Sequence, residues 1–433
     1  MTTKARRGTA KTPDRAVALV RSVHGELTHR SGMAIPLRLW DGSELGDPQA
    51  GFRLVLEHPW SLRLLLRLPF DLAAGEAYTQ GAIDLEGDVV AAMALGARLD
   101  EHGVFSVGEL ARLFRALPRV PRPPRHRGPR RAALHGRMHT KRRDAGAIAF
   151  HYDLPGEFYE AFLGALPVYS CAYWHDPTEP LEAAQTRKLD VVCRKLRLRP
   201  GMRLLDIGCG WGALLLHAAR EYGVHGVGVT LSRTQAEAGR AWVAREGLTD
   251  RLEIRLQDYR DMDGRFDAIA SVGMAEHVGP SHLGEYVGAV WRLLSDGGGF
   301  LNHCIVTGHP DRVRTGRERT FANAYVFPDG GLVPAWRIVQ EIQQGGFEIL
   351  DVEQLRPHYA LTLRRWIRNL ESHHDAAVAS ASELDYRVWR IYMAGSAVGF
   401  ETGSMEIVQV LGHKPGPAGT NPPLGRAWMA PAS

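Results

Sequence analysis

Apolar and polar residues alternate in two stretches near the start of the chain, at positions 33–45 and 50–59. Such alternation predicts strands with one buried face, and Asp41-Gly42 predicts a turn within the first stretch. The spacing of apolar residues over 60–70 and 84–103 is instead compatible with helices. Residues 1–118 are therefore expected to form a small mixed α+β domain with no recognisable chemistry of its own.

From about residue 144 the pattern changes to short apolar runs that alternate with longer segments of helical spacing. This alternation is typical of an α/β domain with a doubly wound, mostly parallel sheet, which we expect over residues 144–415. The predicted strands are 202–207, 225–231, 252–258, 266–274 and 299–306, with 348–355 and 404–413 near the edge of the sheet. The predicted helices between them are 213–223, 232–247 and 282–294.

No acidic residue occurs between positions 119 and 143, although the whole chain has a formal net charge of only +5. Several prolines exclude a regular helix through the first half of this stretch, so it predicts an exposed basic connector over 119–143. Two interpretations stay open: a solvated linker, or a segment that attracts the phosphates of anionic lipids or of nucleic acid. The final residues, 416–433, are rich in proline and glycine and predict a flexible tail.

The four cysteines, Cys171, Cys193, Cys209 and Cys304, have no zinc-binding spacing. No N-terminal run is apolar enough for a signal peptide or a membrane span. These observations predict a cytoplasmic protein without a metal site. Cys171 lies in the aromatic stretch VYSCAYW, and a cysteine there is on its own more typical of a small buried apolar residue than of a nucleophile.

The strongest local signal is LLDIGCGWG at residues 204–212, a buried strand followed by an acid and three glycines at alternate positions. Glycine lets the backbone approach a ligand closely, and the start of the following helix offers free N–H groups. The spacing after Asp206 is G-x-G-x-G, at Gly208, Gly210 and Gly212, and it is similar to the S-adenosylmethionine loop of class I methyltransferases. Because that ligand has no phosphate, Asp206 is expected to serve its ammonium group.

Further cofactor residues are expected at the ends of the next two strands. Thr230 stands where many such folds have an acid for the ribose hydroxyls, so Thr230 and Gln235 are candidates for the ribose. The alternative for both is a strand-end or helix-cap role. Asp258 is placed for the adenine end, and Tyr259 beside it is assigned to the cofactor as well.

Several stretches together resemble the cyclopropane-fatty-acyl-phospholipid synthases and the related mycolic acid methyltransferases, from about residue 150 to residue 413. They are HYDLPGEFYEAFL, VYSCAYW, LDIGCGWG, GVTLSRTQ, QDYRD, SVGMAEHVGP, NHCI, YVFPDGG and HYALTLRRW, and they follow one another in the order of the family. A weaker similarity, AAGEAYTQG at 73–81, points to the family's N-terminal lipid-handling domain. The sequence departs from the family at Pro155-Gly156 and at Ala324.

The resemblance implies a class I S-adenosylmethionine-dependent methyltransferase fold and a bicarbonate ion bound near the sulfonium. Its implied ligands are Cys171, Glu276, His303, Ile305 through its backbone, and Tyr359. Cys171 then holds an anion and is neither nucleophile nor metal ligand. The presence of both His277 and His303 favours closure of a cyclopropane ring.

The implied substrate is the cis double bond of an unsaturated acyl chain in a membrane phospholipid. The protein is accordingly expected at the inner face of the membrane, bound peripherally to an anionic surface, without nucleic acid, and a homodimer is allowed. Two other enzymatic activities stay open: formation of methyl- or methylene-branched fatty acids, and N-methylation of a small molecule. A nucleic-acid-binding protein is a further alternative, but only the basic connector favours it.

Overall fold

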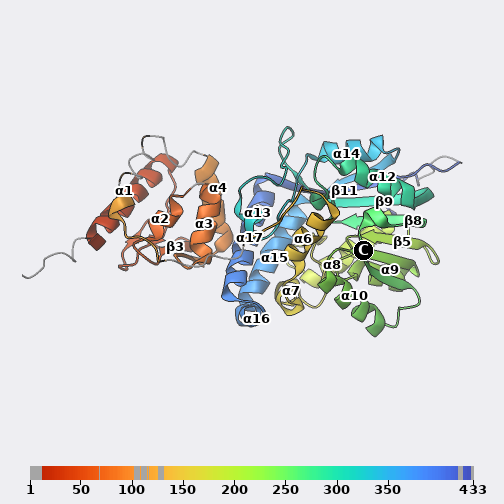
Figure 1. Cartoon of the computed structure of the whole chain (residues 1–433), viewed down its shortest axis with the longest axis horizontal. Helices are drawn as coiled ribbons and strands as arrows, with labels where there is room; N and C mark the ends of the chain where they lie inside the picture. Colours follow the sequence, from red (N-terminus) through yellow and green to blue (C-terminus); the bar gives the residue numbers. More distant parts are fainter. Residues whose placement is uncertain are drawn as a thin grey trace, which may run out of the picture. The chain divides into compact units, whose positions relative to one another are not determined.

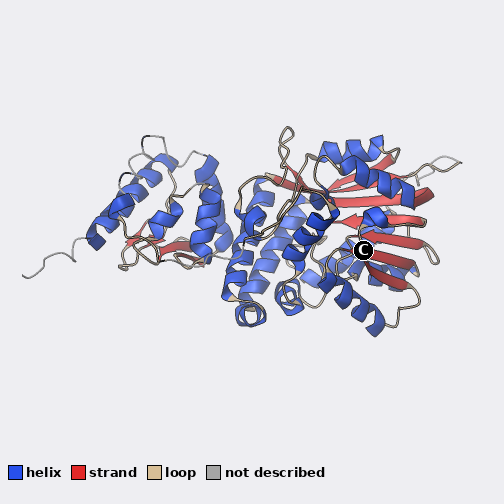
Figure 2. Cartoon of the chain, in the orientation of Figure 1, coloured by secondary structure: helices blue, strands red, loops and turns tan. Residues whose placement is uncertain are grey.

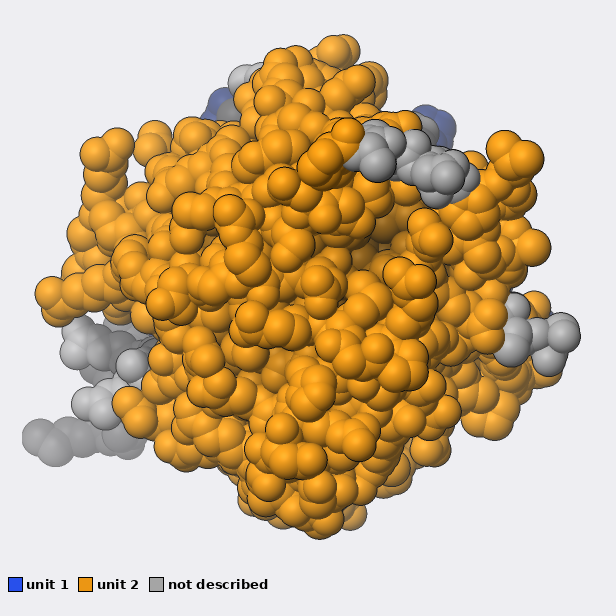
Figure 3. Space-filling view, turned by 90° about the vertical axis from the view of Figure 1, so that its right-hand side faces the viewer, with its two compact units in different colours: residues 1–131, 319–325, 383–398 blue, residues 132–318, 326–382, 399–433 orange. Residues whose placement is uncertain are grey.

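The computed structural model describes residues 12–67, 69–101, 108, 115, 117–124, 131–417 and 423–430. Contacts divide the chain into two compact units, which Figure 3 distinguishes by colour. The first unit consists of residues 1–131, 319–325 and 383–398, and the second of residues 132–318, 326–382 and 399–433. None of the helices in the described parts of the chain is both long and apolar enough to cross a membrane.

The first unit contains a four-stranded sheet in the order β2-β1-β3-β4. Its strands are β1 (Leu37–Arg38), β2 (Glu44–Leu45), β3 (Phe52–Leu56) and β4 (Ile83–Gly87). The first three lie within the two alternating stretches of the sequence. Its helices are α1 (Thr12–Ser31), α2 (Ser61–Leu65), α3 (Phe70–Thr79), α4 (Val89–Glu101), η1 (Leu117–Arg119), α13 (Phe321–Tyr325) and most of α17 (Glu383–Thr402).

Two segments from the second half of the chain complete the first unit. The Phe321 N–H group donates a hydrogen bond of 2.7 Å to Asp71, and a Cβ atom on Gly75 would overlap the Phe321 ring. From α17, Arg387 donates to the Tyr78 carbonyl at 2.9 Å and Arg390 to the Tyr78 hydroxyl at 2.9 Å. Both segments fall inside the range 144–415 that the sequence pattern assigned to a separate domain.

The second unit contains a seven-stranded sheet in the order β10-β11-β9-β8-β5-β6-β7. The strands from β9 to β7 are parallel, and β11 pairs antiparallel with both β9 and β10. The predicted doubly wound, mostly parallel sheet is therefore confirmed. The strands are β5 (Arg203–Ile207), β6 (His225–Thr230), β7 (Leu252–Leu256), β8 (Phe266–Val272), β9 (Leu294–Thr307), β10 (Glu348–Gln354) and β11 (Met405–His413).

Helices cover both faces of this sheet (Figures 1 and 2). Residues of α8, α9 and α10 form one apolar cluster, and residues of α11, α12 and α14 form the other. Leu204 and Leu205 are neighbours on β5, yet each belongs to a different cluster and both are fully buried. Successive strand residues point to opposite faces, so a sheet covered on both sides requires continuous apolar strands.

The helices of this unit are α6 (Lys141–Tyr152), α7 (Gly156–Leu163), α8 (Leu181–Lys195), α9 (Ala213–Tyr222), α10 (Arg233–Arg245), η2 (Tyr259–Asp261), α11 (Ala275–Val278), α12 (Leu283–Leu293), α14 (Ala335–Gln344), α15 (Arg356–Ser372) and α16 (His374–Ser380).

Part of the predicted flexible tail is packed against the second unit. Met429 is 7% exposed and belongs to the same apolar cluster as Leu204, and Trp428 packs against that cluster. Arg426 forms an ion pair with Asp351. Within the predicted tail, residues 428 and 429 thus pack against the core through two large apolar side chains, although prolines and glycines precede them.

The basic connector is also less free than the sequence suggests. Helix α6 begins at Lys141, inside the predicted connector. Arg131 donates to Glu76 at 2.9 Å within the first unit. Arg143 donates through Nε and Nη2 to the Asp329 carboxylate at 2.5 and 2.9 Å. Arg142 is exposed, whereas Arg130 lies outside the described residues.

The Arg143–Asp329 pair yields a stability prediction. Asp329 is 8% exposed, so Arg143→Gln would leave a largely buried carboxylate without its two donors. We expect the free energy of unfolding to fall by about 1–3 kcal/mol, as measured by urea denaturation. Arg142→Gln removes the same charge from the neighbouring exposed position and should change stability by less than about 0.5 kcal/mol. Equal losses in the two variants would contradict a specific role for the pair.

Candidate active site

The glycine loop connects the end of β5 to the start of α9 in the second unit. Gly208, Gly210 and Gly212 have φ angles of 81°, 54° and 88°, in the left-handed region that favours glycine. Asp206, the penultimate residue of β5, is 2% exposed. Its Oδ1 atom has no hydrogen-bond partner among the described residues. Burial raises the pKa of Asp206 to about 7, opposed by the nearby Lys188 charge. The carboxylate is therefore prepared for a cationic ligand.

A pocket opens at the carboxyl ends of the parallel strands, beside this loop. In doubly wound sheets this edge is the usual ligand-binding position. Of the eight residues predicted to bind the cofactor, six line the pocket: Asp206, Gly208, Gly210, Thr230, Gln235 and Tyr259. Gly212 does not line it and instead occupies the N-cap position of α9.

The two proposed ribose ligands are held in place by each other. The Thr230 hydroxyl donates to Gln235 Oε1 at 2.8 Å, and the Ser232 N–H group donates to Thr230 Oγ1 at 3.1 Å. The N-cap of α10 is Ser232, whose hydroxyl accepts from the Gln235 N–H group at 3.2 Å. The amide nitrogen of Gln235 faces the glycine loop, since a Cβ atom on Gly210 would lie 4.0 Å from it. The helix-cap role thus belongs to Ser232, and the side chains of Thr230 and Gln235 face the pocket.

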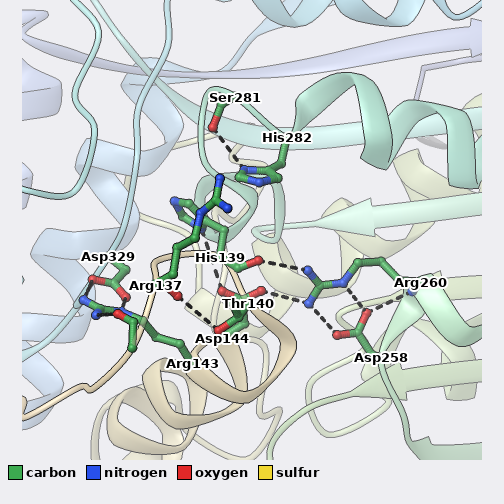
Figure 4. Close-up of polar contacts among 11 residues, drawn as sticks. Arg137, His139, Thr140, Arg143, Asp144, Asp258, Arg260, Ser281, His282 and Asp329 are labelled. Atoms are coloured by element: carbon green, nitrogen blue, oxygen red, sulfur yellow. Dashed lines mark hydrogen bonds and ion pairs between the residues drawn. The ribbon is translucent and has the colours of Figure 1, made fainter.

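Asp258 is bound to protein rather than exposed to the pocket. Arg260 lies between two carboxylates (Figure 4): its Nη2 atom is 2.6 Å from Asp258 and 2.8 Å from Asp144. Burial alone would raise the pKa of Asp258, but its hydrogen bonds from Arg260 hold that pKa below the usual value. Asp144 and Arg260 line the pocket whereas Asp258 does not. The structure therefore places Asp258 beside Arg260, outside the lining of the pocket, and its contact with the adenine stays a prediction.

Glu276, Ile305 and His303 come together beside this pocket. Glu276, on α11, is 3% exposed, and its Oε1 atom accepts a 2.7 Å hydrogen bond from the Ile305 N–H group. Its Oε2 atom has no partner among the described residues, and burial raises the pKa of Glu276 to about 7. His303 lies two residues before Ile305 on β9, on the same face of the strand. It is fully buried, and neither ring nitrogen has a partner among the described residues.

His303 is a neutral imidazole. Burial lowers the pKa of His303 to about 3, and the positive charges of Lys188 and Lys195 act in the same direction. One ring nitrogen of a neutral imidazole donates and the other accepts. His303 can therefore donate one hydrogen bond to an anion and accept one from a proton donor.

Cys171 and Tyr359 are connected to the strand pair of Ile305 by contacts with the Leu355 backbone. The Cys171 thiol lies 3.9 Å from the Leu355 carbonyl, which also accepts from the Tyr359 N–H group at 3.2 Å. The Leu355 N–H group donates to Ile407, which pairs with Ile305 in the sheet. Burial raises the pKa of the Cys171 thiol far above its usual value, so it stays protonated at neutral pH and is a poor nucleophile.

The sequence interpretation missed two buried polar residues of this region. Lys188, on α8, is 3% exposed, lines the pocket and donates to the Ser170 hydroxyl at 3.0 Å. Gln409 is fully buried, pairs with His303 across β9 and β11, and its amide atoms have no partner among the described residues. One signal for Lys188 was present: it interrupts the buried face that includes Ala184 and Val192.

Comparison with known proteins shows similarity to one family and to several of its members. The mycolic acid cyclopropane synthetase family matches residues 139–410. A "Probable fatty acid methyltransferase" of Pseudomonas putida is 39% identical over 387 residues, covering 88% of this chain and 92% of the relative. The cyclopropane-fatty-acyl-phospholipid synthase of Escherichia coli K12 is 38% identical over 261 residues, covering 60% of this chain and 66% of the relative. The structure of mycolic acid cyclopropane synthase CmaA1 with S-adenosylhomocysteine has a TM-score of 0.59 and 32% identity, covering 62% of this chain and 98% of the solved one.

Proposed function

The chain belongs to the mycolic acid cyclopropane synthetase family of S-adenosylmethionine-dependent methyltransferases, and on that premise we propose that it closes a cyclopropane ring on a lipid. The proposed substrate is the cis double bond of an unsaturated acyl chain in a membrane phospholipid, at the inner, anionic membrane surface. Bicarbonate is the proposed base, and its proposed ligands are those expected from the sequence. One observation carries this proposal: a buried acid and a buried neutral histidine lie next to the cofactor pocket with polar atoms that no described residue satisfies.

The side chains at this position suit a small oxyanion. Unpartnered buried polar atoms cost about 1–3 kcal/mol each, so a ligand that pairs with them is strongly favoured. His303 offers a donor, and Glu276 Oε2 offers an acceptor for the O–H group of bicarbonate. The protonated Cys171 thiol donates to the Ala172 carbonyl at 3.2 Å, so it would have to turn from that carbonyl to donate to the anion. The Ile305 N–H group is already bonded to Glu276, so its proposed role includes orienting that acid.

Bound in the pocket, S-adenosylmethionine would supply an electrophilic methyl group and bicarbonate a base for the proton lost on ring closure. The protein must meanwhile protect a cationic substrate from its own nucleophiles. Cys171 does so because its buried thiol stays protonated. Tyr169 lines the pocket and stacks on Trp366, with ring centroids 5.2 Å apart, so its face is placed to stabilise a cation.

The two other aromatic residues near Cys171 in the stretch VYSCAYW, Tyr173 and Trp174, have hydrogen-bond partners elsewhere. The Tyr173 hydroxyl donates to Glu353 at 2.9 Å, and the Trp174 indole donates to Thr362 at 3.0 Å. Neither side chain lines the pocket. Cation stabilisation by this aromatic stretch is therefore assigned to Tyr169 alone.

A second candidate function is the formation of a methyl- or methylene-branched fatty acid. The specific observation in its favour is that the Pseudomonas putida relative, which this chain covers over 92% of its length, is named a fatty acid methyltransferase. Both activities start from the same transfer of a one-carbon unit to an acyl double bond. They differ in the product: ring closure leaves no alkene, a methylene branch retains one, and a saturated methyl branch needs in addition a reductant that supplies hydride.

The test is mass spectrometry of lipids from vesicles of mono-unsaturated phosphatidylglycerol incubated with the protein, S-adenosylmethionine and bicarbonate. A gain of one CH2 without any uptake of hydrogen on mild hydrogenation is the expected result for ring closure. A gain of one CH2 in a product that still takes up hydrogen would support the methylene-branched alternative. No gain in any lipid would contradict both.

Cys171→Ser gives a prediction specific to the bicarbonate site. A hydroxyl can still donate one hydrogen bond to the anion, so we expect kcat at ambient bicarbonate to fall about tenfold and to recover partly as bicarbonate is added. Cys193→Ser, another fully buried cysteine to serine change, is the control and should show no such recovery. Wild-type activity that stays constant in bicarbonate-free buffer would refute the proposed anion site.

A further inference from the structure

Lys188 is a buried cation without a carboxylate partner. The other two lysines buried in the described chain are paired, Lys195 with Asp351 at 2.7 Å and Lys414 with Asp296 at 3.1 Å. The Lys188 ammonium group donates a hydrogen bond of 3.0 Å to the Ser170 hydroxyl. A buried ammonium group is expensive unless an anion accompanies it. We therefore expect a negatively charged ligand beside Lys188, because no carboxylate of the described residues forms an ion pair with it.

The pocket that Lys188 lines narrows the choice of partner. Asp206 lines the same pocket, and its charge is the largest one that opposes the lowering of the Lys188 pKa by burial. The amino-acid end of S-adenosylmethionine carries one ammonium and one carboxylate group. If Asp206 faces the ammonium group, the carboxylate needs a cation from the pocket lining.

Only two lysine or arginine side chains line the described pocket, Lys188 and Arg260. Arg260 is already shared between the carboxylates of Asp144 and Asp258 (Figure 4). His277, which also lines the pocket, is neutral because burial lowers its pKa to about 3. Of the lysine and arginine side chains in the described lining, Lys188 is thus the one with capacity for a further anion.

We propose that Lys188 and Ser170 form a subsite for the carboxylate of the cofactor. The Lys188 ammonium group pairs with the carboxylate directly. Ser170 accepts a hydrogen bond from Lys188, so its own hydroxyl hydrogen is free to point at the same carboxylate. Asp206 and Lys188 together then match the two charges of the amino-acid end, one from β5 and one from α8.

The same cation chemistry suits a second oxyanion, bicarbonate, because Lys188 also acts electrostatically on Cys171 and His303. The cofactor carboxylate is favoured, since Lys188, Ser170 and Asp206 line the pocket whereas Cys171 and His303 do not. The inference rests on S-adenosylmethionine as the cofactor and not on ring closure. Ligand binding without any lipid acceptor therefore tests it separately from the proposed function.

The experiment is calorimetry of the full chain and of Lys188→Met with two ligands, S-adenosylhomocysteine and 5′-methylthioadenosine. The second ligand keeps the adenosine and the sulfur but has no amino-acid end. We expect Lys188→Met to weaken S-adenosylhomocysteine binding at least about tenfold and 5′-methylthioadenosine binding less than about twofold. Lys141→Met, a change of the same charge at an exposed position, is the control and should alter neither affinity.

Two outcomes of the Lys188→Met calorimetry would overturn the proposal. S-adenosylhomocysteine affinity within about twofold of wild type would remove the carboxylate contact, and equal losses for both ligands would indicate a deformed pocket. If S-adenosylhomocysteine affinity is unchanged and the lipid assay needs more bicarbonate, Lys188 belongs to the bicarbonate site instead. If Lys188→Met does not fold, Ser170→Ala decides: we expect about a threefold loss for S-adenosylhomocysteine alone, and no ligand-specific loss would refute the subsite.

Discussion

Glu276→Gln is expected to abolish product formation, with kcat at least about a thousandfold lower, while S-adenosylhomocysteine affinity stays within about twofold of wild type. Glu276 receives the Ile305 N–H group on one oxygen and keeps the other without a partner, away from the lining of the cofactor pocket. An amide retains the shape and the acceptor for Ile305. The amide loses the charge. It presents an N–H donor or a weaker acceptor where the carboxylate would accept a hydrogen bond from the O–H group of bicarbonate.

Two measurements on the same preparation decide this prediction. Lipid mass spectrometry gives turnover, and calorimetry gives cofactor affinity. Glu237→Gln, at an exposed position on α10, is the matched control and should leave both unchanged. Loss of cofactor affinity in Glu276→Gln would instead place the residue at the cofactor. Retained turnover would remove the acid from the proposed chemistry.

Asp206→Asn is expected to weaken S-adenosylhomocysteine binding about 10- to 100-fold. Asp206 is the buried carboxylate proposed to face the ammonium group, and hydrogen bonds to charged groups contribute about 1.5–3 kcal/mol, each 1.4 kcal/mol being a factor of ten. Because burial raises the pKa of Asp206 to about 7, the wild-type affinity should also fall as the pH is lowered from 7 to 5 and the carboxylate becomes protonated. That part of the pH dependence should be absent in the variant.

The control for Asp206→Asn is Asp261→Asn, which removes the same charge from an exposed carboxylate on η2. It should bind the cofactor as wild type does at every pH. If the Asp206→Asn affinity kept the full wild-type decline between pH 7 and pH 5, the titrating group would be another one, and the assignment of Asp206 to the ammonium group would have to be withdrawn.

The contiguous parts of the site were accessible from the sequence. The strand, acid and glycine loop at 204–212 lie next to one another in the chain, so their local geometry follows from the order of the residues, and Asp206 and Gly208 line the pocket as expected. The apolar runs likewise predicted the parallel sheet. The roles of Cys171 and Glu276 came from a resemblance to a family, because spacing alone left the buried apolar interpretation of Cys171 open.

What the sequence did not reveal depends on contacts between distant residues. Lys188 is a lysine within an amphipathic helix, and its burial follows only from the packing of α8 beside the pocket. Asp258 looked available, yet Arg260, two residues away, occupies its carboxylate. Met429 follows a segment rich in proline and glycine, and its burial depends on a core cluster whose other members range from Val168 to Leu411.

The discontinuity of the first unit limits how the protein can be divided. Residues 319–325 and 383–398 fold with the first part of the chain, through contacts such as those of Phe321 with Asp71 and of Arg390 with Tyr78. Deletion of residues 1–131 would therefore remove only part of the first unit and leave residues 319–325 and 383–398 behind. The deletion would remove Asp71, the hydrogen-bond partner of Phe321 on α13, and Tyr78, the partner of Arg387 and Arg390 on α17. Cooperative unfolding of the first unit is therefore expected to release residues 319–325 and 383–398 together with residues 1–131, although they are far apart in the chain.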